Sequence, residues 1–223
     1  MTLLKIRRGI RKHHVAISIA CIASLLLLST WVAFFPLPGL DVRWAQRIQE
    51  ISSPIARSIL IGVTLIGNPF PMAIATSVLL IGLLFTPLRS LARPLSLVIP
   101  ADAFSFLWKF VIDRPRPSLP FVEVLQTFPD PSFPSMHVVH SIVFFGFLGA
   151  VCVHQWIYLK KQWLLVLATA LFSLAAMMPV SRIFVGAHWP TDVLGGLLLG
   201  GAFFTAQLQL YSSQQILHRA RRH

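Results

Sequence analysis

The stretch VAISIACIASLLLLSTWVAFF, residues 15–35, is one of those that decide the fold, and it contains no charged side chain. A helix needs about 20 predominantly apolar residues to cross the hydrocarbon core of a bilayer, so this stretch predicts a transmembrane helix. The rest of the chain has the same character, because 56% of its 223 residues are apolar and only 12% are charged. Soluble domains carry about 25% charged residues, and this composition therefore indicates an integral membrane protein.

Further apolar stretches predict an all-α fold with six transmembrane helices. We place these helices at residues 15–35, 70–85, 91–112, 138–159, 163–180 and 189–211. Residues 42–66 differ from them, because charged residues alternate with apolar ones at helical spacing, as in a helix that lies in the membrane interface. The sequence Gly67-Asn68-Pro69 ends that helix. The prediction is one domain over residues 1–223, a six-span bundle with an extra interfacial helix.

Charged residues are distributed unevenly between the two ends of these spans. Lysine and arginine occur in the tail at 1–14, in the turns at 89–93 and 160–161, and in the tail at 212–223, where acidic residues do not occur. Because basic residues accumulate on the cytoplasmic side, we expect a plasma (inner) membrane protein with both termini in the cytoplasm. The first span is too long for a signal peptide and is expected to remain as an anchor. The dispersed basic residues do not predict nucleic-acid binding.

Three short polar patches stand at the opposite, extracytoplasmic ends of the predicted spans. They are Lys109 with Arg116 and Pro117 (K-x6-R-P), then Pro134-Ser135-Met136-His137, then Ser181-Arg182 with His188 and Asp192 (S-R-x5-H-x3-D). Together they supply three cations, two histidines and a carboxylate. Ionisable groups at membrane depth are costly unless they face a polar cavity or a partner. We therefore expect the loop at 113–135 and the neighbouring helix ends to form one active site.

In their order and internal spacing, the three patches resemble the motifs of the type 2 phosphatidic acid phosphatase superfamily, which are integral membrane lipid phosphatases. The resemblance covers essentially the whole chain and implies six spans, with no metal or other cofactor. It implies that the substrate is a membrane lipid phosphate, and phosphatidic acid, phosphatidylglycerol phosphate and undecaprenyl pyrophosphate are all candidates. One residue departs from the family pattern, since Met136 stands where the second motif normally has glycine.

The resemblance also assigns roles to the residues of the patches. His188 would attack phosphorus to form a phosphohistidine, and Asp192, four residues on, would hold its tautomer. His137 would protonate the leaving alkoxide and then activate water. The phosphate oxygens would be bound by Lys109, Arg116, Arg182, Ser135 and the backbone N–H groups around Met136. The Met136 side chain would occupy space at the phosphate mouth, so we expect altered substrate selectivity or lower turnover.

Each polar residue also has a structural explanation when it is considered alone. Lys109 could pair with Asp113 one turn on, Arg116 and Arg182 could anchor lipid headgroups, and Ser135 is expected to be a helix N-cap in either case. The joint pattern favours a phosphatase site. Two other functions fit the same residues: a lipid-headgroup phosphotransferase, and a catalytically silent protein that binds anionic lipids.

Several residues near the patches receive supporting roles. We expect Arg114 to contact headgroups or substrate from the rim, His140 to lie behind the histidine of the second patch, and Asp102 to balance positive charge within the bundle. The proline-rich segment 118–133 carries several phenylalanines and is expected to cover the site. The glycines between residues 195 and 201 predict close helix packing.

Overall fold

The computed structural model describes the backbone of residues 3–220 and the side chains of residues 12–68 and 71–215. This part of the chain contains helices and no strand, which confirms the all-α prediction. Most of the basic side chains of the two tails lie outside the described residues. The helices are α1 (Leu3–Phe34), α2 (Gly39–Gln49), α3 (Pro54–Ile66), α4 (Pro69–Leu84), η1 (Arg89–Leu91), α5 (Ala92–Leu95), α6 (Val98–Ile112), α7 (Met136–Ser141), η2 (Ile142–Gly146), α8 (Phe147–Leu159), α9 (Gln162–Phe184) and α10 (Pro190–Ala220).

Within the described residues, 5 helical segments are long and apolar enough to cross a membrane. The remaining predicted span corresponds to α4, which is bent by 56° against α3. The number of spans reaches 6 when this bent pair is counted as one. The five segments are Lys12–Phe34, Arg89–Ile112, Met136–Leu159, Gln162–Phe184 and Pro190–Gln215.

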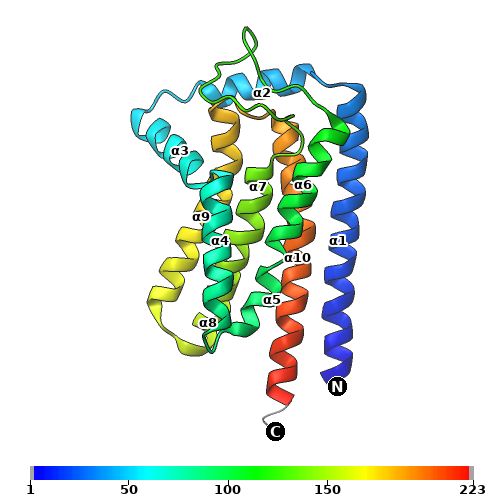
Figure 1. Ribbon diagram of the computed structural model, residues 1–223, viewed down its shortest axis with the longest axis vertical. Coiled ribbons are helices and arrows are strands. Elements are labelled where there is room, and N and C mark those ends of the chain that lie inside the picture. Colours follow the sequence, from blue (N-terminus) through cyan, green and yellow to red (C-terminus); the bar gives the residue numbers. More distant parts are fainter. Residues whose placement is uncertain (1–2, 221–223) are drawn as a thin grey trace.

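The prediction of one continuous interfacial helix at 42–66 is wrong, because the structure has two helices there, α2 and α3. Pro54 opens α3, where its missing N–H group costs no helical hydrogen bond. The hydroxyl of Ser53 accepts the N–H of Ala56 at 3.4 Å and caps the new helix. As a result, α2 lies across one end of the bundle while α3 turns back toward α4 (Figure 1).

The helices form a bundle in which α1 packs along α10, α8 packs along α9, and α7 contacts α6, α9 and α10. The first turns of α1 and the last turns of α10 lie at one end of this bundle, and α2 and the loop after α6 cover the other end (Figure 1). Large apolar side chains remain exposed along the spans, among them Leu27, Val78, Val111 and Val166. Such a surface suits contact with lipid, and the protein is a membrane protein.

Glycines on α10 allow this helix to lie close to the start of α7. A Cβ atom on Gly196 would lie 2.8 Å from the Ser135 carbonyl oxygen and 2.9 Å from the Val138 Cβ atom. A Cβ atom on Gly200 would lie 3.0 Å from that of Ile142. Close helix packing at these glycines was predicted, and the structure confirms it. The contact brings the second polar patch next to the third.

One turn of π-helix, η2, interrupts the fourth span between α7 and α8. A π turn contains one residue more than an α turn and often occurs at functional sites. Val143, Phe144 and Phe145 in this turn are buried in the largest apolar core. The irregular turn is therefore held by packing on several sides.

Candidate active site

The structure brings the three polar patches together at the end of the bundle that α2 covers. Nearly all of these side chains are buried despite their charge or polarity, and only Arg116 and Met136 are half-buried. They come from the last turn of α6 (Lys109), the loop after it (Arg116), the start of α7 (Ser135, Met136, His137), the last turn of α9 (Arg182), the loop after it (His188) and the first turn of α10 (Asp192).

His137 and His188 face each other across this site. Their ring centroids are 6.3 Å apart, and their planes meet at 65°. The ring of Phe128 packs edge-on against His137, with the centroids 5.7 Å apart. Two imidazoles at this separation are close enough to flank one phosphorus atom, as the predicted chemistry requires.

A tight chain reversal between α9 and α10 sets the position of His188. The N–H of His188 donates to the Arg182 carbonyl at 3.2 Å, and Gly186 between them adopts a φ of 68°, which favours glycine. The carboxylate of Asp192 then accepts the Trp189 N–H at 2.8 Å. In this arrangement His188 Nδ1 lies 3.6 Å from Asp192 Oδ2, which is an electrostatic contact and longer than a hydrogen bond.

The surroundings of His188 favour a neutral imidazole. Burial lowers the pKa of His188 well below its usual range, and the positive charges of Arg116, Lys109 and Arg182 lower it further. Arg116 Nη1 lies 3.4 Å from His188 Nε2, so this nitrogen faces the cations while Nδ1 faces Asp192. A neutral ring keeps a lone pair available at pH 7, which a nucleophilic histidine needs.

Arg114 does not lie at the rim, and the prediction that placed it there is wrong. Its side chain is fully buried. Its Nη1 atom donates to Asp192 Oδ1 and its Nη2 atom to Asp41 Oδ2, each at 2.5 Å. Asp41 also accepts the backbone N–H of Thr191 at 2.9 Å. Arg114 therefore connects α2 with the carboxylate that faces His188.

Two of the three cations expected to bind phosphate are paired with Asp130. Lys109 Nζ lies 2.8 Å from Asp130 Oδ2, and Arg116 Nη2 lies 2.8 Å from Asp130 Oδ1. Lys109 thus pairs with Asp130 in place of Asp113, whose side chain is exposed. Burial alone would raise the pKa of Asp130, but the hydrogen bond from Lys109 and the charges of Lys109 and Arg116 outweigh burial and leave that pKa below its ordinary value. Asp130 is therefore ionised at pH 7.

The third cation, Arg182, keeps part of its guanidinium unpaired. Its Nη1 atom donates to Gln126 at 2.9 Å, whereas Nε and Nη2 are buried without a hydrogen-bond partner among the described residues. The hydroxyl of Ser135 is also buried and unpaired there. Ser135 occupies the N-cap position of α7 as predicted, but its side chain makes no capping bond. Buried donors of this kind are costly, and a ligand rich in oxygen atoms would satisfy them.

The aromatic ring of Phe128 contacts two of the cations. The guanidinium carbon of Arg116 lies 4.8 Å from the ring centroid, and that of Arg182 lies 5.0 Å from it. Such cation–π contacts orient the guanidinium groups without neutralising them. The proline-rich segment 118–133 therefore covers the site through Phe128, in agreement with the sequence prediction.

A pocket of about 260 Å³ opens among these groups. Met136 lines this pocket beside His137, so the residue that departs from the family motif does border the expected phosphate site. An effect of Met136 on selectivity stays a prediction. The pocket is lined by Phe106, Lys109, Arg116, Phe128, Pro129, Asp130, Met136 and His137.

Sequence reasoning missed the two carboxylates that organise the cations, Asp41 and Asp130. Asp130 lies between Pro129 and Pro131, and Asp41 is three residues after Pro38. Both belong to segments assigned to the outer surface, and this was the available signal. Asp130 is 14 positions from Arg116 and Asp41 is 73 positions from Arg114. Spacing along one helix cannot relate residues that lie so far apart.

Membrane-spanning helices that gather two histidines, three cations and a carboxylate at one end of the bundle, beside a pocket lined by His137, Lys109 and Arg116, define a membrane protein with a histidine-containing anion site. A family model described as the PAP2 superfamily matches residues 70–215, which include all three polar patches. The chain belongs to the PAP2 superfamily.

Similar proteins include one curated relative and two solved structures. An Escherichia coli (strain K12) protein, provisionally named undecaprenyl-diphosphatase YbjG, is 37% identical over 86 residues, which are 36% of this chain and 38% of that protein. A transmembrane PAP2-type phosphatidylglycerolphosphate phosphatase from Bacillus subtilis has a TM-score of 0.72 at 20% identity and covers 88% of this chain and 96% of its own. LpxE from Aquifex aeolicus has a TM-score of 0.56 at 22% identity, and the match covers 77% of this chain and 96% of the LpxE chain. The two structures have a similar fold.

Proposed function

We propose that this protein hydrolyses a lipid phosphate or pyrophosphate through a phosphohistidine intermediate. The observation that carries the proposal is the distance of 6.3 Å between the rings of His137 and His188, beside a pocket lined by Lys109 and Arg116. A protein that only binds anionic lipids needs the cations but has no use for a buried neutral histidine backed by a carboxylate. Membership of the PAP2 superfamily supports the same reaction.

In the proposed first step, His188 Nε2 attacks phosphorus and the bond from phosphorus to the leaving oxygen breaks. His137 gives its proton to that oxygen, and Asp192 stabilises the positive charge that develops on the His188 ring. In the second step, His137 takes a proton from water, the resulting hydroxide attacks the phosphohistidine, and inorganic phosphate leaves with His188 restored. The facing rings of the two histidines support these roles, with His137 lining the pocket and His188 beside Arg116.

Lys109, Arg116 and Arg182 would stabilise the negative charge on the phosphate oxygens throughout. Removing one donor from such a site typically lowers the rate by about 10²- to 10³-fold. Without substrate, Asp130 accepts hydrogen bonds from Lys109 and Arg116. The incoming phosphate would share these two donors with Asp130 or replace it as their acceptor. The cations supply the neutralisation for which other phosphoryl-transfer enzymes use magnesium, so we expect the reaction to need no metal.

We place both termini in the cytoplasm and the active site at the extracytoplasmic face of a plasma (inner) membrane. The turns that carry Arg89 and Lys160 lie at the same end of the bundle as the first turns of α1 and the last turns of α10 (Figure 1). The acidic residues Asp41, Asp113 and Asp130 belong to the other end. This asymmetry supports the orientation, because lysine and arginine are retained on the cytoplasmic side.

The substrate class that we propose is a lipid whose tail stays in the bilayer while its phosphate enters the pocket. Phosphatidic acid, phosphatidylglycerol phosphate and undecaprenyl pyrophosphate all meet this description. The names of the E. coli and B. subtilis relatives support the last two. Transfer of the phosphoryl group to a lipid hydroxyl would use the same phosphohistidine and differ only in the acceptor.

The test is release of phosphate from a panel of these lipids in detergent, with a chelator present, together with trapping of the labelled phosphoenzyme by a denaturing quench at alkaline pH, because phosphohistidine is stable to base and labile to acid. We expect His188→Ala to abolish both signals and His137→Ala to slow turnover by at least about 10²-fold. His13→Ala, the same change at an exposed histidine near the start of the first span, is the matched control and should behave like the wild type. Release that survives His188→Ala would reject this nucleophile, and no release from any lipid would favour a lipid-binding protein.

A further inference from the structure

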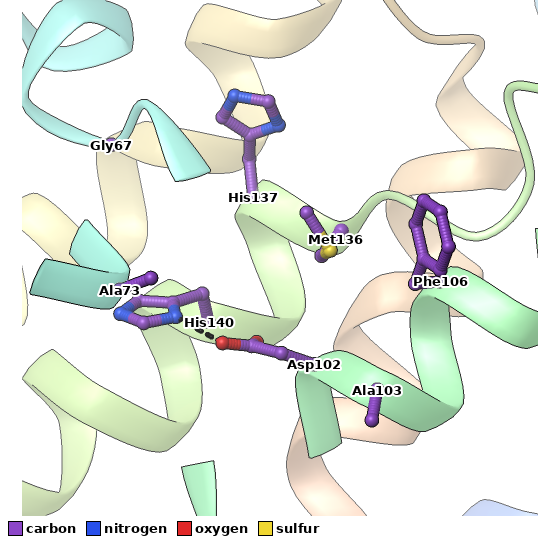
Figure 2. A pocket seen from close by; sticks show the side chains of 8 residues that line it. All are labelled: Gly67, Ala73, Asp102, Ala103, Phe106, Met136, His137 and His140. Atoms are coloured by element: carbon purple, nitrogen blue, oxygen red, sulfur yellow. Dashed lines mark hydrogen bonds and ion pairs between the residues drawn. The ribbon is translucent and has the colours of Figure 1, made fainter. Parts of the chain in front are cut away.

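A second cavity, of about 420 Å³, lies between α4, α6 and α7 (Figure 2). It shares Phe106, Met136 and His137 with the phosphate pocket, so the two spaces adjoin at these three residues. The phenylalanine and the neighbouring Ala103 are exposed, which places the opening of the cavity on the lipid-facing side of the bundle. A molecule in the bilayer can therefore enter this cavity with its polar end at the phosphate pocket.

The walls of the cavity are apolar apart from His137 and one hydrogen-bonded pair of polar side chains. His140 Nδ1 lies 2.6 Å from Asp102 Oδ2 (Figure 2). In Figure 2 the pair lies below the side chains of His137 and Met136, and the His137 ring points away from it. Asp102 was expected to balance charge in the bundle and His140 to support His137. In the structure they pair with each other instead.

The hydrogen bonds of this pair are incomplete within the described residues. Asp102 Oδ1 is buried and has no hydrogen-bond partner there, and His140 Nε2 has only a long contact of 3.5 Å with the Thr76 hydroxyl. A buried carboxylate oxygen without a donor is costly, the more so among apolar side chains at membrane depth. Asp102 Oδ1 is a hydrogen-bond acceptor. A ligand group that satisfies it must therefore be a donor, such as a hydroxyl.

The position of Asp102 defines which part of a lipid it would meet. It precedes Lys109 by two turns of α6, which is about 10 Å along the helix axis. A phosphate held at Lys109 does not reach that depth, whereas the segment that joins the phosphate to the tail does. In glycerol-based lipids this segment carries oxygen atoms and can carry a free hydroxyl. In polyprenyl lipids it is hydrocarbon.

We propose that the cavity binds the segment of the lipid next to the phosphate and that Asp102, held by His140, accepts a hydrogen bond from a hydroxyl of a glycerol backbone. The protein then favours glycerol-based phosphate lipids with a free hydroxyl over polyprenyl phosphates. This inference rests on the proposed phosphatase function and specifies its substrate class. A hydrogen bond to a charged acceptor is worth about 1.5–3 kcal/mol, which corresponds to a preference of roughly 10- to 150-fold.

The test compares two lipids that differ in one hydroxyl, 1-oleoylglycerol 3-phosphate and the oleoyl ester of 3-hydroxypropyl phosphate. We expect the wild type to turn over the first with a kcat/KM at least about tenfold higher. In the double variant Asp102→Leu with His140→Phe, both partners become apolar side chains of similar size, and the ratio should fall to about one. The ratio is measured on a single preparation, so partial loss of folded protein does not affect it. Glu123→Leu, an exposed carboxylate, is the matched control and should keep the wild-type ratio.

A binding measurement separates this inference from the proposed function. Affinities of the same two lipids are measured with the His188→Ala variant, which cannot form the phosphoenzyme. Preference for the hydroxyl lipid in binding supports the subsite even if no lipid is hydrolysed, and in that case only the phosphatase proposal fails. Equal kcat/KM and equal affinity for the two lipids, a preference that persists in the double variant, or faster turnover of farnesyl phosphate would each overturn the subsite.

Discussion

Arg114 holds two buried carboxylates on one guanidinium group. Asp41 comes from α2 and Asp192 from α10, so the arginine joins the helix that covers the site to the helix that orients His188. Removing one member of a buried ion pair leaves its partners charged without compensation. Arg114 is therefore more important for stability than an arginine on the surface of the same protein.

We predict that Arg114→Met destabilises the folded protein by about 3–5 kcal/mol, because two carboxylates would lose their buried partner. The measurement is the midpoint of denaturation in detergent, compared with Arg47→Met. Arg47 pairs with Glu50 at 3.1 Å, but both side chains are more than half exposed, at 74% and 62%. The control should change stability by less than about 0.5 kcal/mol, and equal effects of the two substitutions would contradict the role of Arg114.

The second prediction at this scale concerns the pH dependence of the reaction. Burial and three nearby cations lower the pKa of His188, so protonation of the free enzyme should inactivate it only below the ordinary histidine value of about 6.5. The measurement is the acid limb of kcat/KM against pH. Substrates whose phosphates have different pKa values separate titration of the enzyme from titration of the substrate. An acid limb that lies above pH 6.5 with all of them would contradict a neutral, buried His188.

The same shift has a consequence for stability. The unfolded chain binds a proton at His188 as the pH falls below about 6.5, whereas the folded chain does not until the pH is much lower. The contribution of this residue to folding is therefore fully present above that pH and declines below it.

The residue types of the site could be predicted from the sequence, whereas several of their partners could not. His188 and Asp192 are close because they are four residues apart around the start of one helix, and the sequence contains that information. The ion pairs of Arg114 and Asp130 depend on how separate segments pack against each other. The spacing of residues along the sequence does not show which distant segments will pack against each other.

At the scale of elements, the contact between α10 and the start of α7 determines how far the two histidines are from each other. Gly196 leaves room for the carbonyl of Ser135, and the N–H of Ser135 donates to the Asp192 carbonyl at 3.0 Å. The second and third motifs are thus tied together by backbone contacts as well as by their side chains.

We predict that Gly196→Ala lowers kcat/KM by at least about tenfold, because its Cβ atom would push the start of α7 and His137 away from His188. The matched control is Gly82→Ala in α4, where a Cβ atom would meet nothing within 4 Å. The control should keep full activity and gain slightly in stability, since alanine favours a helix. Equal activity of the two variants would show that this close approach does not position the site.

The positions of the long spans were predictable from hydropathy, because each long apolar run must be covered by lipid or by other helices. The division between α2 and α3 was missed although Ser53 and Pro54 are strong helix-start signals. Continuous spacing of apolar residues across 42–66 had favoured one helix. At Ser53 and Pro54 the helix-start signals are better evidence than the periodicity of the apolar residues.

At the scale of the whole molecule, the proposed active site lies where four segments distant in sequence meet at one end of the bundle. The apolar lateral surface and the polar, aromatic-rich end suit a protein that receives its ligand from the bilayer rather than from water. Six spans and the three patches predicted this arrangement in outline. The cavity below Met136 was not predictable, since its walls come from α4, α6 and α7 together.

The π turn at Ile142–Gly146 has a consequence for any comparison along the fourth span. A helical wheel advances about 100° per residue, and the additional residue of a π turn offsets everything beyond it by about that angle. The polar face that begins at His137 and His140 therefore does not continue as the same face of α8. Relatives without the turn would align with this chain only through a one-residue gap, and deleting one residue there would rotate the half of the span that follows the turn relative to the half that carries His137 and His140.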